Sequence, residues 1–229
     1  MSESLRELLY PLGFLSSLAF GGRFLLQWLT SEIERKSTVT KVFWQLSLFG
    51  NILLLVHSLI QSQFHVSLIQ GCNAIISWRN INLMDVKGRQ VSFNSVIYLL
   101  AGTAACITLF FLIQGYFLGQ SFNHWFRLPV WDGEAPAEVG FIWHLVGIVG
   151  LILFSSRFWV QWWLAEKAKT SYLGEAFWWL SLIGGGLSLL YFIRIDDPVN
   201  IIGPAFGLVP YLRNLMLLKK SQKPIPAGN

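Results

Sequence analysis

Four arginines interrupt stretches of sequence that are otherwise strongly apolar: Arg23, Arg79, Arg157 and Arg213. A charged side chain inside an apolar helix costs about 3 kcal/mol in a membrane, so it requires a partner or a function. A guanidinium presents a planar fork of N–H donors that binds phosphate or carboxylate through two parallel hydrogen bonds. The arginines therefore predict a site for an anionic headgroup. The alternative is that they anchor helices at the interface or pair with backbone carbonyls.

Each arginine is accompanied by an amide side chain, either four residues later on the same helix face or at the next position. We predict that the arginines hold a phosphate and that the amides read the rest of the headgroup. The amides are equally suited to hydrogen bonds between helices. The complete predicted site is Arg23, Gln27, Arg79, Asn80, Arg157, Gln161, Arg213 and Asn214.

Three other features have simpler interpretations. Glu32 and Glu166 are expected to form caps or ion pairs at the cytosolic ends of their helices, with a role as proton carriers as the alternative. The Phe-Trp pairs at 43–44 and 177–178 are predicted to join an aromatic belt at the cytosolic interface. Pro204 and Pro210 are predicted to break the last helix, because proline lacks a backbone donor.

Seven apolar blocks must position these side chains. The chain is 54% hydrophobic and 13% charged, with a mean hydropathy of +0.52. Each block has roughly the 20 residues that a helix needs to cross a bilayer, and single strands cannot span one. The sequence therefore predicts an all-α integral membrane protein. The blocks are residues 8–29, 42–60, 66–84, 94–115, 140–164, 174–193 and 198–218.

An internal repeat organises these blocks. Residues 23–50 recur at 157–184, displaced by 134 positions, with 12 identities in 28. The repeat predicts three helices, one unmatched helix and three helices, a parallel arrangement because the unmatched helix restores the direction of the second unit. The predicted domains are a first three-helix repeat (1–84), a linker helix with an outer loop (85–139), a second repeat (140–218) and a basic tail (219–229).

Lysine and arginine placement predicts the orientation. With seven spans, ten of these residues lie on one side and three on the other, which places the N-terminus outside and the C-terminus in the cytosol. The net charge of +5 indicates anionic lipids as the partner and not nucleic acid. Cys72 and Cys106 both fall inside predicted spans, so no disulfide or metal site is expected.

Catalytic motifs are not evident in the sequence. We find no glycine-rich phosphate loop, no metal-ligand spacing and no nucleophile–base pair, and no soluble segment long enough for a glycosyltransferase domain. The expectation is therefore that the chain is not an enzyme and uses no cofactor.

The repeated motif resembles the lipid A biosynthesis N-terminal domain family. The resemblance rests on Arg23, Gln27-Trp28, Ser31-Glu32, Lys36-Ser37, Phe43-Trp44 and Arg79-Asn80, and on their counterparts Arg157, Gln161-Trp162, Glu166, Ser171, Phe177-Trp178 and Arg213-Asn214. It implies a three-helix membrane unit, found fused to some lipid-A-disaccharide synthases or as small proteins. The family is distantly similar to the PQ-loop group of SemiSWEET and SWEET sugar transporters, whose eukaryotic members share the three-one-three plan.

These observations together predict a flippase-like protein of the bacterial inner (cytoplasmic) membrane. Its expected ligand is an anionic lipid-linked sugar, either a polyprenyl (undecaprenyl) phosphate glycan or a lipid A precursor. One alternative is a SWEET-like transporter of a soluble sugar. Another is a non-transporting scaffold for a membrane glycosyltransferase.

Overall fold

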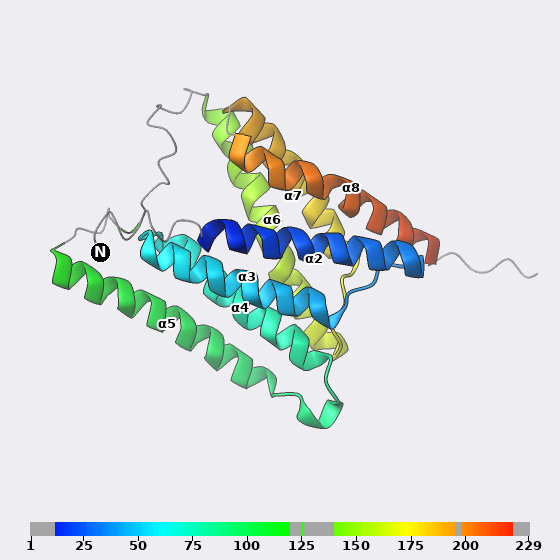
Figure 1. Ribbon diagram of the computed structural model, residues 1–229, viewed down its shortest axis with the longest axis horizontal. Helices are drawn as coiled ribbons and strands as arrows, with labels where there is room; N and C mark the ends of the chain where they lie inside the picture. The colour runs from blue at the N-terminus through cyan, green and yellow to red at the C-terminus, as the bar shows by residue number, and fades with distance from the viewer. Residues whose placement is uncertain (1–11, 120–124, 126–139, 196–197, 222–229) are drawn as a thin grey trace, which may run out of the picture. The chain divides into compact units, whose positions relative to one another are not determined.

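The computed structural model describes residues 12–119, 125, 140–195 and 198–221, and in these residues it contains seven α-helices and no strand (Figure 1). Each predicted apolar block falls on one helix, so the all-helical prediction is confirmed. A short 3-10 helix, η1 (Lys87–Arg89), follows the third helix. The helices are α2 (Leu12–Glu34), α3 (Lys41–Ile60), α4 (Phe64–Leu83), α5 (Phe93–Leu118), α6 (Phe141–Ala168), α7 (Glu175–Arg194) and α8 (Pro198–Ser221).

Four of these helices have the length and apolar composition needed to cross a membrane: α3, α5, α6 and α7. The most apolar is α5, and only 22% of its best 18-residue stretch is buried, as expected for a helix that faces lipid. Helices α2, α4 and α8 carry more polar side chains along their described lengths. The chain is thus a helical membrane domain, and the seven-span layout with its orientation stays a prediction.

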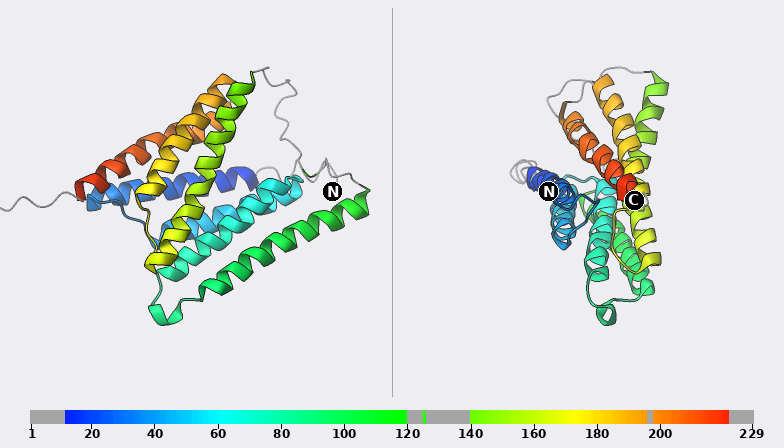
Figure 2. Two further views of the ribbon diagram at one scale, coloured as in Figure 1. Left: turned by 180° about the vertical axis from the view of Figure 1, so that it is seen from behind. Right: turned by 90° about the vertical axis from the view of Figure 1, so that its right-hand side faces the viewer.

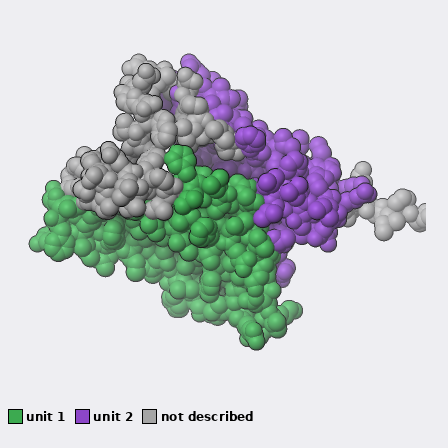
Figure 3. Space-filling view, in the orientation of Figure 1, with its two compact units in different colours: residues 1–23, 41–133 green, residues 24–40, 134–229 purple. Residues whose placement is uncertain are grey.

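The chain divides into two compact units (Figure 3). Unit 1 contains residues 1–23 and 41–133, and unit 2 contains residues 24–40 and 134–229. The division runs through α2, whose first half belongs to unit 1 and whose second half belongs to unit 2. Most of the predicted outer loop and the end of the predicted basic tail lie outside the described residues, and the predicted domain boundaries stay predictions.

Each unit is a row of consecutive helices. In unit 1, α4 packs against both α3 and α5, and in unit 2, α7 packs against both α6 and α8 (Figures 1 and 2). Small residues permit close approach in unit 2: a Cβ added at Gly184 of α7 would lie 2.5 Å from the backbone nitrogen of Phe154 in α6. The matching position in unit 1, Gly50, faces the ring of Phe20 instead.

The Phe-Trp pairs at 43–44 and 177–178 are core residues. Their exposed fractions are 0–1%, and in each pair the two rings meet edge to face with centroids 5.0 Å apart. The prediction of an interfacial aromatic belt is therefore wrong. These residues begin α3 and α7 and point inward, and in unit 2 the indole N–H of Trp178 donates to Ser37 Oγ at 3.0 Å.

Helix α8 continues through both of its prolines. Pro204 and Pro210 lie inside the helix, which runs from Pro198 to Ser221, so the prediction that they break it is wrong. Membrane helices tolerate proline because neighbouring groups satisfy the backbone that it leaves unpaired. Buried residues on the following turn, Tyr211 and Asn214, hold this part of α8 against its unit.

Candidate anion-binding site

Arg23 is a buried arginine held by aromatic rings within unit 1. Only 4% of the residue's surface is exposed. Its guanidinium carbon lies 4.6 Å from the ring centre of Phe20 and 5.4 Å from that of Phe43, and Nη1 donates to Ser47 Oγ at 2.8 Å. Cation–π contacts and a hydrogen bond thus stabilise the buried charge.

Arg157 repeats this arrangement within unit 2. It lies 3.4 Å from the ring centre of Phe154 and 5.8 Å from that of Phe177, which occupy the positions matching the two rings around Arg23. Its Nη1 donates to the hydroxyl of Tyr211 at 3.5 Å. The arginine–aromatic core is therefore a structural property of both repeats.

Arg79 organises the connection between α4 and α5. Its Nη1 donates to Asn82 Oδ1 at 2.7 Å and to the carbonyl of Val91 at 2.9 Å, and the same Asn82 oxygen accepts from the Val91 N–H. The neighbouring Asn80 is fully buried and donates to the carbonyl of Ile76 within its helix. These contacts fit the anchoring alternative for arginine.

Two of the predicted amides meet in unit 2. Gln27 of α2 donates to Asn214 Oδ1 at 2.9 Å, and Asn214 Nδ2 donates back to Gln27 Oε1 at 3.3 Å. Gln27 also donates to the carbonyl of Thr38, and Gln161 donates to the matching carbonyl of Tyr172 at 3.1 Å. The amide pair joins the second half of α2 to α8.

Beside this amide pair, Glu32 of α2 and Arg213 of α8 form an ion pair with two hydrogen bonds. Arg213 donates from Nε to Glu32 Oε1 and from Nη2 to Oε2, the latter at 2.8 Å. The indole N–H of Trp28 also donates to Oε1 at 3.3 Å. Glu32 is thus in an ion pair, one of the two expected roles. Arg213 is 43% exposed, so its guanidinium is accessible from solvent.

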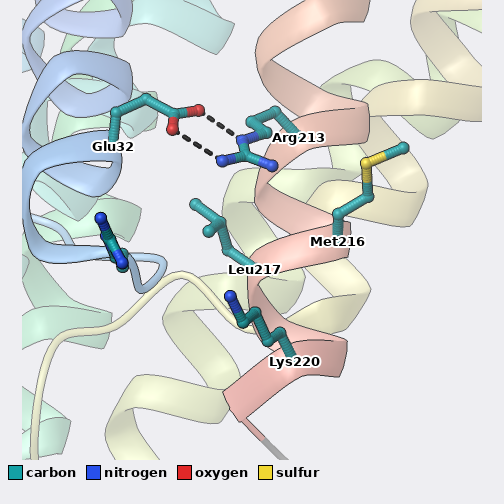
Figure 4. A pocket seen from close by; sticks show the side chains of 6 residues that line it. Glu32, Arg213, Met216, Leu217 and Lys220 are labelled. Carbon is teal, nitrogen blue, oxygen red and sulfur yellow. Dashed lines mark hydrogen bonds and ion pairs between the residues drawn. The ribbon is translucent and has the colours of Figure 1, made fainter.

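A pocket of about 480 Å³ surrounds this ion pair (Figure 4). Glu32 reaches from α2 toward Arg213, and the remaining labelled side chains come from α8 (Figure 4). Three of the six lining residues are cationic, one is anionic and two are apolar, and the volume lies in the usual range for small-molecule sites. The lining residues are Glu32, Arg35, Arg213, Met216, Leu217 and Lys220.

The backbone conformation after α2 and the spacing along α8 position the cationic residues of the pocket. Arg35 follows the last residue of α2 in a left-handed conformation with φ of 52°, and the matching Lys169 has φ of 54° after α6. The turn directs Arg35 past the end of its helix. On α8, Arg213, Leu217 and Lys220 are separated by four and three residues, so they share one face.

The predicted site is thus distributed over several places. The structure brings Gln27, Asn214 and Arg213 together, while Arg23, Arg79 and Arg157 lie in the contacts described above, as do Asn80 and Gln161. Sequence reasoning missed Arg35 and Lys220 as pocket residues. One signal was present for Arg35, because its match in the repeat, Lys169, is also basic.

The hydrogen bond from Arg213, together with its positive charge, holds the pKa of Glu32 below the ordinary value. Such a group contributes stability above its unfolded pKa, about 4.3, and loses it as pH falls through the lowered folded pKa. We expect Glu32→Gln to lower Tm by a constant amount from about pH 8 to pH 5, and by less at more acid pH. Thermal melts of both proteins across pH test this. A difference that persists undiminished at about pH 2 contradicts an electrostatic origin.

Comparison with known families decides the identity of the repeated unit. The sequence matches the Lipid A Biosynthesis N-terminal domain twice, at residues 12–82 and 146–216. The second match follows the first by the same 134 positions as the internal repeat, and together they cover more than half of the chain. The chain belongs to the Lipid A Biosynthesis N-terminal domain family. The resemblance seen in the sequence is confirmed.

Relatives in this family are long proteins. Lipid-A-disaccharide synthases of Chlamydia pneumoniae and Chlamydia felis are 42% and 39% identical to this chain over 219 and 220 residues. The protein of the same name from Chlamydia trachomatis serovar D is 36% identical over 221 residues. These alignments cover 95–96% of this chain but only 34–36% of each relative, so the chain spans about a third of their length. No solved structure matches the chain.

These relatives correct one expectation. The expectation that the chain is not an enzyme is wrong, because chains 36–42% identical to it over almost its whole length bear the name of a synthase. The expectation rested on finding no catalytic motif in this sequence. The relatives named as synthases are about three times as long as this chain. The family membership establishes a membrane domain related to lipid A biosynthesis.

Proposed function

We propose that this family member is a multi-pass domain of the bacterial inner membrane that binds an anionic lipid-linked sugar and moves it between the leaflets. The ligand is a phosphate-bearing glycolipid of lipid A or envelope glycan synthesis, such as a polyprenyl phosphate sugar or a lipid A precursor. The N-terminus lies outside and the C-terminus in the cytosol. Family membership and the four candidate spans support the membrane and lipid A parts of the proposal.

The observation that carries the proposal is the pocket between the end of α2 and α8. An exposed guanidinium, a second guanidinium and an ammonium face one volume, and arginine forks are suited to phosphate. Within the described residues, the side chains of Arg35 and Lys220 form no hydrogen bond or ion pair. Met216 and Leu217 add an apolar wall suited to the hydrocarbon next to a lipid phosphate.

The amide pair supports the pocket from one side. Gln27 and Asn214 fix the second half of α2 against α8, which holds Glu32 and Arg213 within hydrogen-bonding distance at the pocket. We propose that phosphate binds to Arg213 together with Arg35 and Lys220. The remaining predicted ligand contacts stay predictions. They are phosphate contacts of Arg23, Arg79 and Arg157 and headgroup contacts of Gln27, Asn80, Gln161 and Asn214.

Removing the pocket cations is expected to weaken binding of a lipid phosphate. A hydrogen bond to a charged group contributes about 1.5–3 kcal/mol, so Arg213→Gln combined with Lys220→Gln should lower affinity for undecaprenyl phosphate by about tenfold or more. Native mass spectrometry of the protein in mild detergent measures the bound fraction. The matched control is Lys219→Gln, because Lys219 lies on the same helix but over the ring of Trp179 and outside the pocket.

Three outcomes contradict this assignment. Equal binding of undecaprenyl phosphate by the parent and the double variant would show that the pocket is not the lipid site. Binding that falls equally with the Lys219 control indicates nonspecific attraction to positive charge. Stabilisation by soluble hexoses without any lipid binding favours the sugar-transport alternative. Movement between leaflets is measured with a fluorescent polyprenyl phosphate in vesicles, where the double variant should lose the activity.

A second candidate function is favoured by the relatives. Because chains named lipid-A-disaccharide synthase contain this domain over about a third of their length, the domain is suited to hold a lipid substrate for such an enzyme. The same pocket then presents the lipid without translocating it. Lipid binding that persists in vesicles without any movement between leaflets selects this function over transport.

A further inference from the structure

We propose that one end of unit 2 forms a binding surface for anionic phospholipids at the bilayer interface. Two lysine–tryptophan pairs make this surface, and both lie within unit 2: Lys167 with Trp163, and Lys219 with Trp179. The proposal goes beyond the proposed function, because it concerns the lipids that surround the domain and holds for any ligand of the pocket.

An exposed stripe along α6 changes its chemical character from one end to the other. Its members are three, four or seven residues apart, so they share one face of the helix. The stripe begins with aliphatic side chains, continues with two tryptophans and ends with a lysine. This is the order met on passing from hydrocarbon through the interface to the headgroups. The exposed residues are Leu145, Val149, Ile152, Trp159, Trp163 and Lys167.

The length of α6 fits this order. From Phe141 to Trp159 the helix rises by about 27 Å, close to the roughly 30 Å of a hydrocarbon core. Trp163 lies one further turn along, about 6 Å, which matches the depth of the polar interface on each side of the core. The exposed tryptophans thus occupy the position that the sequence suggested for the Phe-Trp pairs.

The lysine side chains lie over tryptophan rings. Nζ of Lys167 is 5.0 Å from the ring centre of Trp163, and Nζ of Lys219 is 5.8 Å from that of Trp179. Cation–π attraction holds each ammonium at the level of its ring. In the part of the chain that the structure describes, neither ammonium forms a hydrogen bond or an ion pair, and both lysines are exposed. Their N–H donors therefore remain available to phosphate oxygens.

This surface also places the pocket in the bilayer. Lys220 lines the pocket and directly follows Lys219 on α8, whereas Arg213 lies six residues before Lys219. Six residues of helix rise by about 9 Å. The pocket therefore extends from the level of the headgroups to at most about 9 Å below it, where the phosphate of a membrane lipid can reach Arg213.

Nitroxide labels test whether the stripe faces lipid. Each label is attached to one introduced cysteine, Leu145→Cys, Ile152→Cys or Lys167→Cys, after the exposed Cys106 is changed to alanine; Cys72 is buried. In vesicles of phosphatidylcholine and phosphatidylglycerol, molecular oxygen should reach the label at 152 best, because oxygen concentrates in hydrocarbon. A water-soluble nickel chelate should reach the label at 167 best.

Two results of the labelling would overturn the proposal. Equal access of the chelate to positions 152 and 167 would show that α6 does not cross from hydrocarbon to headgroups. Low access of both reagents at 145 and 152 would show that protein covers the stripe, either a partner or a second copy of the chain. Size-exclusion profiles in detergent confirm that the labelled variants are folded.

Brominated lipids test the preference for anionic headgroups. Bromine on the acyl chains quenches the fluorescence of exposed tryptophans nearby, so competition between brominated phosphatidylglycerol and phosphatidylcholine reports which lipid lies beside the rings. One lysine near the surface should favour phosphatidylglycerol by about fivefold. Lys167→Gln combined with Lys219→Gln should abolish that preference.

The matched control changes the same amount of charge elsewhere in unit 2. Lys36→Gln combined with Lys169→Gln removes two lysines that pair with glutamates, at 3.2 Å and 3.5 Å, and should keep the preference. Equal loss in both double variants would show general attraction to positive charge and overturn the assigned surface. Because these experiments contain no undecaprenyl phosphate, their failure leaves the proposed function intact, and failure of the pocket leaves this surface intact.

Discussion

Gly184→Ala should lower the stability of the folded protein by about 1–3 kcal/mol, the range for an overpacked core. A Cβ at this position would lie 2.5 Å from the nitrogen and 2.9 Å from the Cα of Phe154, and 3.0 Å from the carbonyl oxygen of Gly150. All three atoms belong to the backbone of α6, so no side-chain rotation relieves the contact. Helices α6 and α7 must separate, and Tm in detergent should fall by several degrees.

The same helix supplies the control. Gly186 has no atom within 4 Å of an added Cβ, so Gly186→Ala should leave Tm unchanged or raise it slightly through helix propensity. Gly50→Ala in unit 1 should be milder than Gly184→Ala, because it meets the ring of Phe20, which can rotate. Equal Tm values for the Gly184 and Gly186 variants would contradict the close approach of the two helices.

Trp178→Ala should destabilise the protein by about 3–5 kcal/mol and reduce the yield of folded material. The side chain is fully buried, and its ring packs edge to face on Phe177 and lies 6.2 Å from the ring centre of Tyr211. Its indole N–H also holds Ser37 in the segment after α2. Truncation leaves a cavity and removes this hydrogen bond.

The adjacent residue is a matched control for this change. Trp179 is 39% exposed. Its indole N–H donates to Glu175 on the same helix, the one side-chain hydrogen bond that Trp179 forms within the described residues. Trp179→Ala should therefore cost less than half as much as Trp178→Ala. Size-exclusion profiles and thermal melts in one detergent compare the two variants. A larger loss for Trp179 would show that contact with the surrounding membrane or detergent outweighs core packing.

The helices could be predicted from sequence because the apolar blocks are long and separated by charged or turn-forming residues. The predicted block 42–60, for example, corresponds to α3 at Lys41–Ile60. The two structural predictions that failed concerned residue types with two plausible environments. Tryptophan suits both an interface and a core, and proline disrupts an isolated helix more than one held in a bundle. Periodicity does not distinguish these cases.

The candidate site was less accessible to sequence reasoning. The repeat identified Arg213 and Asn214 as candidate site residues. It did not show that Asn214 hydrogen-bonds to Gln27, which lies 187 positions earlier. Nor does spacing show that Arg35 leaves its helix in a left-handed turn. Such pairings depend on which helices become neighbours, and this is decided by packing across the whole unit.

The division of α2 between the two units has a consequence for biosynthesis. Gln27, Glu32 and Ser37 are synthesised early, yet their partners Asn214, Arg213 and Trp178 follow 141 to 187 residues later. At roughly 5–20 residues per second, the ribosome needs about 10 to 40 s to cover the longest of these separations. During that interval the polar face at the end of α2 is available to insertion factors and lipids, and unit 2 becomes complete only as translation of α8 ends.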